Sequence, residues 1–374
     1  MEDETTPAIE PLKAVDEPLP ETPPLIERFL HLDSTDIHIS SGEKPYIRVN
    51  GDLAPMHGED AMSAEEVEEL TRIILGEEHF QKFIHAHECD YAVSLLSGER
   101  MRINASVQRG RISLSIRLLS SKFMALETLG LSRRIVSYIC TLRHGMVLVT
   151  GATGSGKSTT LASFINEMNM TRSAHIVTIE EPIEYLHKNK TSFVTQREVG
   201  SDTKSFSEAL RRSFRQDPDI VLIGEMRDEE TIRAALTLSE TGHLTFGTLH
   251  TSEAFQTVIR IIGSFPPTEQ ERARHVLATT LRVVICQQLV PRIDGKGRVL
   301  ATETLVVNSI VRALIRENKL HQIPVMMKNG TEQGMSTMNQ SLARLVRQRI
   351  VSQDIASSFS PDREDFMEEL VNRT

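Results

Sequence analysis

The stretch Met146-Val-Leu-Val-Thr-Gly151-Ala-Thr-Gly-Ser-Gly-Lys157-Ser-Thr159 decides the fold of this chain. It joins a short, apolar run to a loop of the pattern G-x-x-x-x-G-K-[ST], which is typical of a phosphate-binding loop between a buried strand and a helix. The glycines let backbone N–H groups approach phosphate oxygens without a Cβ clash, and the helix directs its positive end at the anion. We therefore expect nucleotide binding by Gly151, Thr153, Gly154, Ser155, Gly156, Lys157, Ser158 and Thr159.

Two residues of this loop have the most specific chemistry. Lys157 is expected to reach the β and γ phosphates, and the hydroxyl of Ser158 is expected to bind Mg²⁺. The alternative is a glycine-rich turn that happens to contain Lys-Ser. It is disfavoured because the pattern lies between a predicted strand and a predicted helix. The predicted ligands are therefore ATP and Mg²⁺.

Acidic residues follow two further apolar runs, 176–179 and 220–223. The first run ends in Glu180-Glu181-Pro-Ile-Glu184, and carboxylates at the end of a strand beside a phosphate loop can orient or deprotonate an attacking water. The second ends in Gly-Glu225, whose carboxylate would hold Mg²⁺ directly or through water. The alternatives are a solvated acidic loop for the first group and a helix-start acid for Glu225.

Two histidines flank a short predicted strand over 244–247. His243 precedes it and His250 follows it. A lone histidine is more often structural than catalytic. The pattern by itself therefore leaves both interpretations open, a structural residue or a sensor of the γ-phosphate.

The alternation of short apolar strands with helical segments from about residue 129 indicates a parallel sheet covered on both faces. Residues 25–119 instead show alternating strands and one capped helix, which predicts a smaller α+β domain. Residues 1–24 are acidic and rich in proline, and we predict a disordered tail there. The predicted domains are thus 1–24, 25–119 and 120–374, the last with a mostly helical part after about residue 308.

Composition excludes several classes. The chain has 374 residues, is 39% hydrophobic and has a net charge of −9, which is ordinary for a soluble globular protein. No apolar run reaches the length of a membrane span. Cys89, Cys140 and Cys286 are too widely spaced for a disulfide framework or thiolate zinc site. Because much of the negative charge lies in the first 24 residues, the rest is near neutral, and no nucleic-acid partner is expected.

The four motifs, in this order, resemble the secretion ATPase superfamily of type II secretion and type IV pili. The resemblance is greatest to twitching-motility ATPases of the PilT/PilU type. The matching motifs are the phosphate loop, an aspartate box at Thr178–His187, an atypical Walker B segment at Arg215–Glu225 and a His box at Thr241–His250. The resemblance implies an α/β fold with a RecA-like ATPase domain, a PAS-like N-terminal domain and a hexameric ring.

Residue roles follow from the resemblance. Glu184 matches the catalytic glutamate, Glu225 the Walker B acid, and both histidines match His-box positions. Arg102 and Arg117 match two arginines that approach the γ-phosphate, although both could also be surface strand residues. Their spacing would let both point to one face. Glu180 and Glu181 are further acids of the aspartate box. Glu181 stands where the family usually has Asp, which has one methylene fewer.

The resemblance also implies a function and a cellular location. Residues 310–317, Ile-Val-Arg-Ala-Leu-Ile-Arg-Glu, match the retraction motif Ala-Ile-Arg-Asn-Leu-Ile-Arg-Glu at five of eight positions. The prediction is a hexameric motor for pilus retraction that acts on an inner-membrane platform protein, with a paralogous pilus ATPase as a further candidate partner. It is expected in the cytoplasm at the inner face of the inner membrane. The alternatives are an extension or secretion motor, a nucleotide-binding accessory ring subunit, and a DNA translocase, which the near-neutral charge disfavours.

Overall fold

The computed structural model describes residues 19–32, 34–49, 52–119, 123–200 and 202–371. The chain divides into two compact units, Met1–Ser121 and Lys122–Thr374, and each is described by itself. Within the described residues, no helix is both long and apolar enough to cross a membrane. The predicted tail falls mostly on residues 1–18, which lie outside the described ranges.

Unit 1 is built on a six-stranded antiparallel sheet with the order β3-β2-β1-β6-β5-β4. The alternation of apolar and polar residues at 36–39 and 46–49 predicted two of these strands, and both form. The elements of unit 1 are α1 (Pro24–Leu30), β1 (Asp36–Ser40), β2 (Tyr46–Val49), β3 (Asp52–Pro55), α2 (Ala64–Ala86), β4 (Glu88–Ser94), β5 (Arg100–Gln108) and β6 (Arg111–Leu119).

Two details of unit 1 connect sequence to structure. Ser63 and Glu66 form the predicted capping box at the start of α2, and Gly76 has a non-helical backbone that divides this helix in two. Leu19 is 5% exposed in the core of the unit and donates its N–H to the carbonyl of Ser94. The prediction that the tail extends to residue 24 is therefore wrong, because Leu19 has apolar surface to bury and a strand carbonyl to bond.

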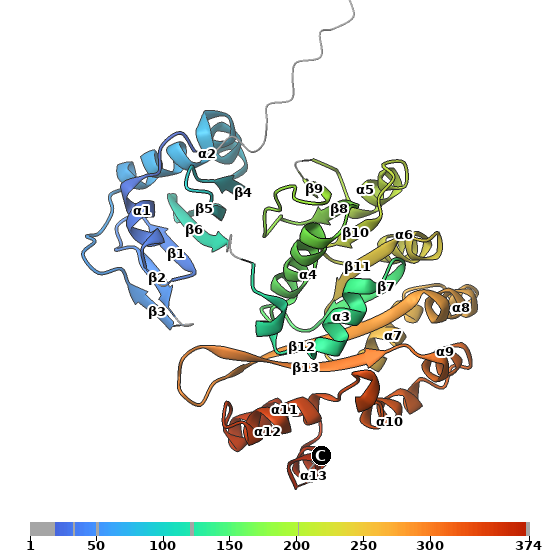
Figure 1. The fold of residues 1–374 in the computed structure, drawn as a ribbon. Coiled ribbons are helices and arrows are strands. Elements are labelled where there is room, and N and C mark those ends of the chain that lie inside the picture. The colour runs from blue at the N-terminus through green and yellow to red at the C-terminus, as the bar shows by residue number, and fades with distance from the viewer. Residues whose placement is uncertain (1–18, 33, 50–51, 120–122, 201, 372–374) are drawn as a thin grey trace, which may run out of the picture. The chain divides into compact units, whose positions relative to one another are not determined.

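Unit 2 contains a seven-stranded sheet with the order β13-β12-β7-β11-β10-β8-β9 (Figure 1). Its pairs are parallel except for β12 with β13, which confirms the predicted α/β class. The strands are β7 (Gly145–Thr150), β8 (His175–Glu180), β9 (Phe193–Glu198), β10 (Ile220–Ile223), β11 (Leu244–Leu249), β12 (Leu281–Pro291) and β13 (Arg298–Val306).

Helices cover both faces of this sheet, because its central strands are apolar on both sides. One core joins the sheet to η1 (Leu126–Leu129), α3 (Arg133–Thr141) and α4 (Lys157–Thr171). A second core joins the opposite face to α5 (Phe206–Ser213), α6 (Glu229–Glu240), α7 (Ala254–Gly263) and α8 (Gln270–Thr280). As a result, the loops at the carboxyl ends of β7, β8, β10 and β11 meet at one edge of the sheet.

The chain after β13 is mostly helical, as predicted from about residue 308. It forms α9 (Ser309–Arg316), η2 (Leu320–Gln322), α10 (Ile323–Lys328), η3 (Thr331–Gln333), α11 (Met338–Arg347), α12 (Gln353–Phe359) and α13 (Arg363–Val371). The predicted retraction motif falls on α9, which buries Val311, Leu314 and Ile315. The matching residues therefore form an amphipathic helix.

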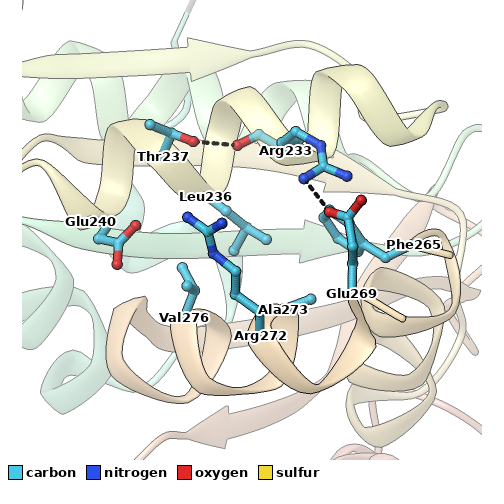
Figure 2. Close-up of a pocket in the computed structure, with 9 residues that line it drawn as sticks. All are labelled: Arg233, Leu236, Thr237, Glu240, Phe265, Glu269, Arg272, Ala273 and Val276. Atoms are coloured by element: carbon cyan, nitrogen blue, oxygen red, sulfur yellow. Dashed lines mark hydrogen bonds and ion pairs between the residues drawn. The ribbon is translucent and has the colours of Figure 1, made fainter. Parts of the chain in front are cut away.

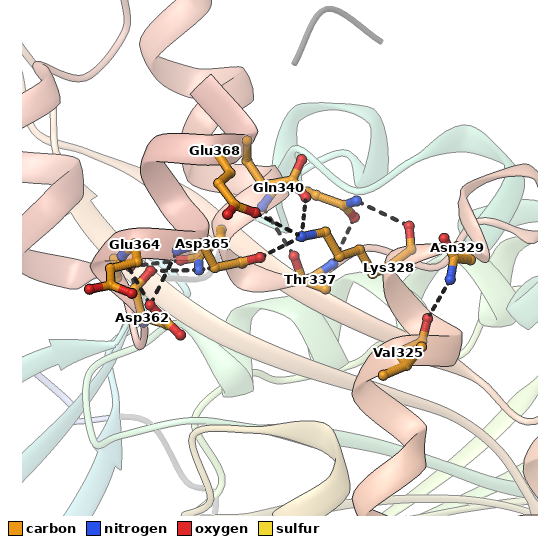
Figure 3. A network of polar contacts seen from close by, with 12 residues as sticks. Val325, Lys328, Asn329, Thr337, Gln340, Asp362, Glu364, Asp365 and Glu368 are labelled. Carbon is orange, nitrogen blue, oxygen red and sulfur yellow. Dashed lines mark hydrogen bonds and ion pairs between the residues drawn. The ribbon is translucent and has the colours of Figure 1, made fainter. Parts of the chain in front are cut away.

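A polar network fastens the last helix. The ammonium of Lys328 lies 2.6 Å from Asp365, 3.5 Å from Glu369 and 3.9 Å from Glu368 (Figure 3). Asn339 donates to Asp365 at 2.7 Å, and Phe366, the next residue of α13, is fully buried. One lysine therefore lies within ion-pair distance of three carboxylates of α13, while an aromatic ring of the same helix is buried.

Candidate functional site

The phosphate loop runs from the end of β7 at Thr150 to the first residue of α4, Lys157, as predicted. Three of its glycines have positive φ, 140° at Gly151, 76° at Gly154 and 88° at Gly156. A Cβ added at Gly151 would overlap the carbonyl oxygen of Gln287 on β12 and the side chain of Ser155. Only glycine allows this backbone to pass so close to its neighbours.

The loop has polar groups available for an anion. The hydroxyl of Ser155 is buried and has no hydrogen-bond partner within the described part of the chain. The N-cap of α4 is Gly156, so no side chain satisfies the first N–H groups of that helix. Unpaired N–H and O–H donors at a helix N-terminus fit phosphate oxygens. The residues present therefore suit the triphosphate that the motif predicts.

Lys157 connects this loop to the predicted acids. Its Nζ donates to the carbonyls of Gly151 at 2.8 Å and Ala152 at 3.1 Å. Burial lowers the pKa of the Lys157 ammonium, and the nearby carboxylates of Glu225 and Glu184 act in the opposite direction. The structure thus brings these two acids close enough to the loop lysine to act on its charge.

Glu180 ends β8 in a desolvated position. Burial raises the pKa of its carboxyl to about 7, although Thr178 donates to it at 2.6 Å and Gln196 at 3.3 Å. Ionised Glu184 nearby also favours the protonated form. Glu180 therefore holds a proton more strongly than an ordinary glutamate does.

The loop after β8 is held by a residue that the sequence analysis missed. Gln196 on β9 donates to the carbonyl of Tyr185 at 2.9 Å and accepts from the N–H of His187 at 2.6 Å. The hydroxyl of Tyr185 lies 2.9 Å from that of Thr159 on α4. Glu184 is therefore flanked by a loop that is bonded to both β9 and the phosphate-loop helix. No local pattern could have identified Gln196, because it acts across parallel strands.

Glu225 lies at the centre of an ion-pair cluster at the carboxyl end of β10. His250 Nε2 lies 2.9 Å from one carboxylate oxygen and Arg227 donates to the other at 2.7 Å. The hydrogen bond from Arg227 is the main reason why the pKa of Glu225 is lowered. Arg227 also approaches Glu181 at 3.5 Å, so it bridges the two acidic segments. The sequence analysis named Glu225, Glu181 and His250 but missed Arg227, two residues after Glu225.

His243 lies elsewhere in the same unit. It precedes the first residue of β11, so the length of that strand, about 20 Å, separates it from His250. Its Nδ1 contacts the carbonyl of Leu238 and the hydroxyl of Thr241, both at 3.0 Å. The two histidines thus lie at opposite ends of one strand, as predicted, and since parallel strands bring only their carboxyl ends together, His243 lies apart from Glu225 and His250 within one chain. Its role in the His box stays a prediction. Here His243 caps the end of α6.

In unit 1, Arg102 and Arg117 are directly opposite each other on the antiparallel pair β5 and β6. Both are exposed, whereas the next pair along, Ile103 and Ile116, is buried. The prediction that the two arginines share a face is thus confirmed. Asp36 accepts a 2.7 Å hydrogen bond from Arg117. This carboxylate already offsets part of the positive charge of the arginine pair.

A surface pocket lies between α6 and α8 (Figure 2). In it Arg233 binds Glu269 at 2.6 Å and its guanidinium lies 4.9 Å from the ring centroid of Phe265. The pocket is lined by Arg233, Leu236, Thr237, Glu240, Phe265, Glu269, Arg272, Ala273 and Val276. None of these residues belongs to the phosphate loop or to the acidic segments, so this pocket is separate from the predicted nucleotide site.

Comparison with known proteins identifies the family. Residues 99–341 match the family described as "Type II/IV secretion system protein". The chain is 44% identical to the "Twitching motility protein" of Neisseria gonorrhoeae over 87% of this chain and 88% of the relative. It is 40% identical to the "Type IV pilus retractation ATPase PilT" of Pseudomonas aeruginosa over 89% and 96%. A crystal structure of the pilus retraction motor PilT with bound ADP superposes with a TM-score of 0.85 at 41% identity, over 92% of this chain and 98% of that one. The chain therefore belongs to the type II/IV secretion system protein family and, within it, to the twitching-motility and pilus-retraction ATPases.

Proposed function

We propose that this chain is an ATP-hydrolysing motor that powers the retraction of type IV pili. One observation carries the proposal: among the described residues, the loop from β7 to α4 leaves the Ser155 hydroxyl and the first N–H groups of α4 without side-chain partners, at the edge of the sheet where Glu184 and Glu225 follow β8 and β10. A nucleotide site with acids beside the terminal phosphates can hydrolyse as well as bind. The relatives named for twitching motility and pilus retraction supply the task.

The loop residues suit ATP, and two oxygen donors suit Mg²⁺. Ser158, in the first turn of α4, would supply a hydroxyl, and Glu225 would supply a carboxylate directly or through water. Bound Mg²⁺ would neutralise charge on the β and γ phosphates. Lys157 would leave the carbonyls of Gly151 and Ala152 and turn to the same phosphates, since those carbonyls are the weaker partners for an ammonium.

Hydrolysis needs an oriented water and compensation of charge. Glu184 would accept the proton of the attacking water, the role that its match to the catalytic glutamate of the aspartate box implies. Glu180 would help to position this loop, because it accepts from Gln196, whose amide also bonds the carbonyl of Tyr185. Arg102 and Arg117, which are neighbours on the exposed face of β5 and β6, would stabilise the γ-phosphate.

The wider assembly is also part of the proposal. The motor would be a hexameric ring that engages an inner-membrane platform protein from the cytoplasmic face. Sequential closure of the subunits round the ring would convert turnover into movement of that protein. A paralogous pilus ATPase is a further candidate partner.

Turnover of the purified chain tests the enzymatic part. With Mg²⁺ and ATP, the wild type should turn over on the order of 0.1–10 s⁻¹. Glu184→Gln should bind ATP but turn over at least about 10²-fold more slowly. Glu240→Gln, on the last turn of α6, is the matched control and should behave as the wild type. ATP binding without turnover in the wild type would instead mean an accessory subunit, and normal turnover in Glu184→Gln would refute the role of that residue.

A further inference from the structure

Phe123, the second residue of unit 2, packs onto the loop that carries the predicted catalytic acid. Its ring stacks on His187 with the centroids 4.7 Å apart and on Tyr185 with the centroids 5.8 Å apart. The ammonium of Lys190 lies 5.9 Å from the same ring centroid. The point at which the chain enters unit 2 is therefore fastened by an aromatic ring to the segment 185–190.

The residue at the start of this segment also contacts the helix that follows the phosphate loop. Tyr185 follows Glu184, and its hydroxyl is 2.9 Å from that of Thr159 in the first turn of α4. Backbone N–H groups in that turn are the ones expected to cradle phosphates. Two contacts, one stacked and one hydrogen-bonded, thus connect Phe123 to the nucleotide-binding helix.

The remaining partners make this segment stiff. Gln196 bonds the backbone of Tyr185 and of His187, so the loop has little freedom to absorb a displacement locally. Burial lowers the pKa of His187 to about 4, with Lys190 acting in the same direction, so the ring that stacks on Phe123 is neutral at pH 7. A shift of α4 should consequently reach Phe123 rather than be lost in the loop.

We infer that Phe123 is a positioning residue: it holds Tyr185, and with it Glu184, in the geometry for hydrolysis, and it transmits occupancy of the phosphate loop to the start of unit 2. The inference rests on the proposed function. It assigns no contact with substrate to Phe123. It also requires the Tyr185 hydroxyl, because that group makes the bond to α4.

Fluorescence tests the transmission. The chain has no Trp, so Phe123→Trp places the sole indole at this position. ATP with Mg²⁺ should change its emission, and adding Tyr185→Phe, which removes only the hydroxyl, should reduce that change by about fivefold or more, since the bond to Thr159 is lost. Emission that does not change when ATP and Mg²⁺ are added would overturn the inference. A response that Tyr185→Phe leaves unchanged, while a fluorescent ATP analogue still binds, would overturn it as well.

Kinetics test the positioning. Phe123→Ala should lower kcat about tenfold or more with the KM for ATP within about twofold, because misplacement by about 1 Å can cost about 10²-fold in rate while binding persists. Phe123→Tyr, which keeps the stack, should restore kcat. Phe123→Leu keeps apolar volume without the stack and replaces the alanine variant if that one misfolds.

Phe193→Ala is the matched control, since that ring lies on β9, is 60% exposed and lies tilted against His175 instead. It should leave kcat unchanged. A Phe123→Ala or Phe123→Leu enzyme with wild-type kcat would refute the positioning role. A wild-type chain that neither binds nor hydrolyses ATP would instead refute the proposed function, so the two failures are distinguishable.

Discussion

His187 offers a quantitative test of the packing beside the acidic loop. Burial lowers the pKa of its imidazole from 6.5 to about 4, and the ammonium of Lys190 contributes in the same direction. Its Nδ1 is buried and finds no partner among the described residues, so a protonated ring would leave an N–H unsatisfied. The native state therefore disfavours the protonated imidazole.

The sign of the pH dependence follows from this depressed pKa. Below pH 6.5 the unfolded chain binds a proton at His187 that the native chain does not, so stability falls as the pH falls towards 4. From the two pKa values, the loss between pH 7.5 and pH 5.0 is about 2 kcal/mol, and it approaches about 3 kcal/mol below pH 4. His187→Phe keeps a ring against Phe123 but removes the titrating group.

Urea unfolding at pH 7.5 and pH 5.0, at one protein concentration, measures this difference. Other groups titrate equally in both proteins, so His187→Phe should lose about 2 kcal/mol less than the wild type between the two pH values. Lys190→Gln should lose less free energy of unfolding between the two pH values than the wild type, but more than His187→Phe. The reason is that it removes only the charge of Lys190, which lowers the pKa of His187 less than burial does. Equal losses in the wild type and His187→Phe would refute the reasoning.

Two further substitutions probe the nucleotide site. Gly151→Ala should weaken ATP binding about 100-fold or more, because the new Cβ overlaps the carbonyl of Gln287. Gly242→Ala has a similar positive φ but open space around it, so it should bind a fluorescent ATP analogue as the wild type does, and equal affinity for both variants would contradict the steric argument. Arg227→Gln should move the acidic limb of kcat/KM to higher pH, since the guanidinium is the main cause of the low pKa of Glu225 and hydrolysis requires that carboxylate ionised. An unchanged pH–rate profile would show that Arg227 does not lower the pKa of Glu225 in the working enzyme.

The central sheet could be predicted because its strands are apolar on both faces. The runs at 176–179 and 220–223 lack polar interruptions and became β8 and β10. The edge strand β9 was missed because Phe193–Glu198 is half polar, which is typical of a strand paired on one side only. Local composition does not show that its neighbour is β8.

The site was predictable where residues lie at the ends of parallel strands. Glu225 and His250 follow two adjacent strands, and the structure places them 2.9 Å apart. His243 belongs to the same motif but lies at the other end of β11. Gln196 and Phe123 could not be found, because each reaches the acidic loop from a segment whose position depends on tertiary packing.

Surface pili test the central claim most directly. In a strain that lacks this gene, we predict excess pili and lost twitching. Complementation with the wild type should restore both, and complementation with Glu184→Gln should restore neither, because that variant binds ATP without rapid turnover. Cells without pili would mean an extension motor, and unchanged pili and twitching in the deletion strain would contradict a role as the retraction motor.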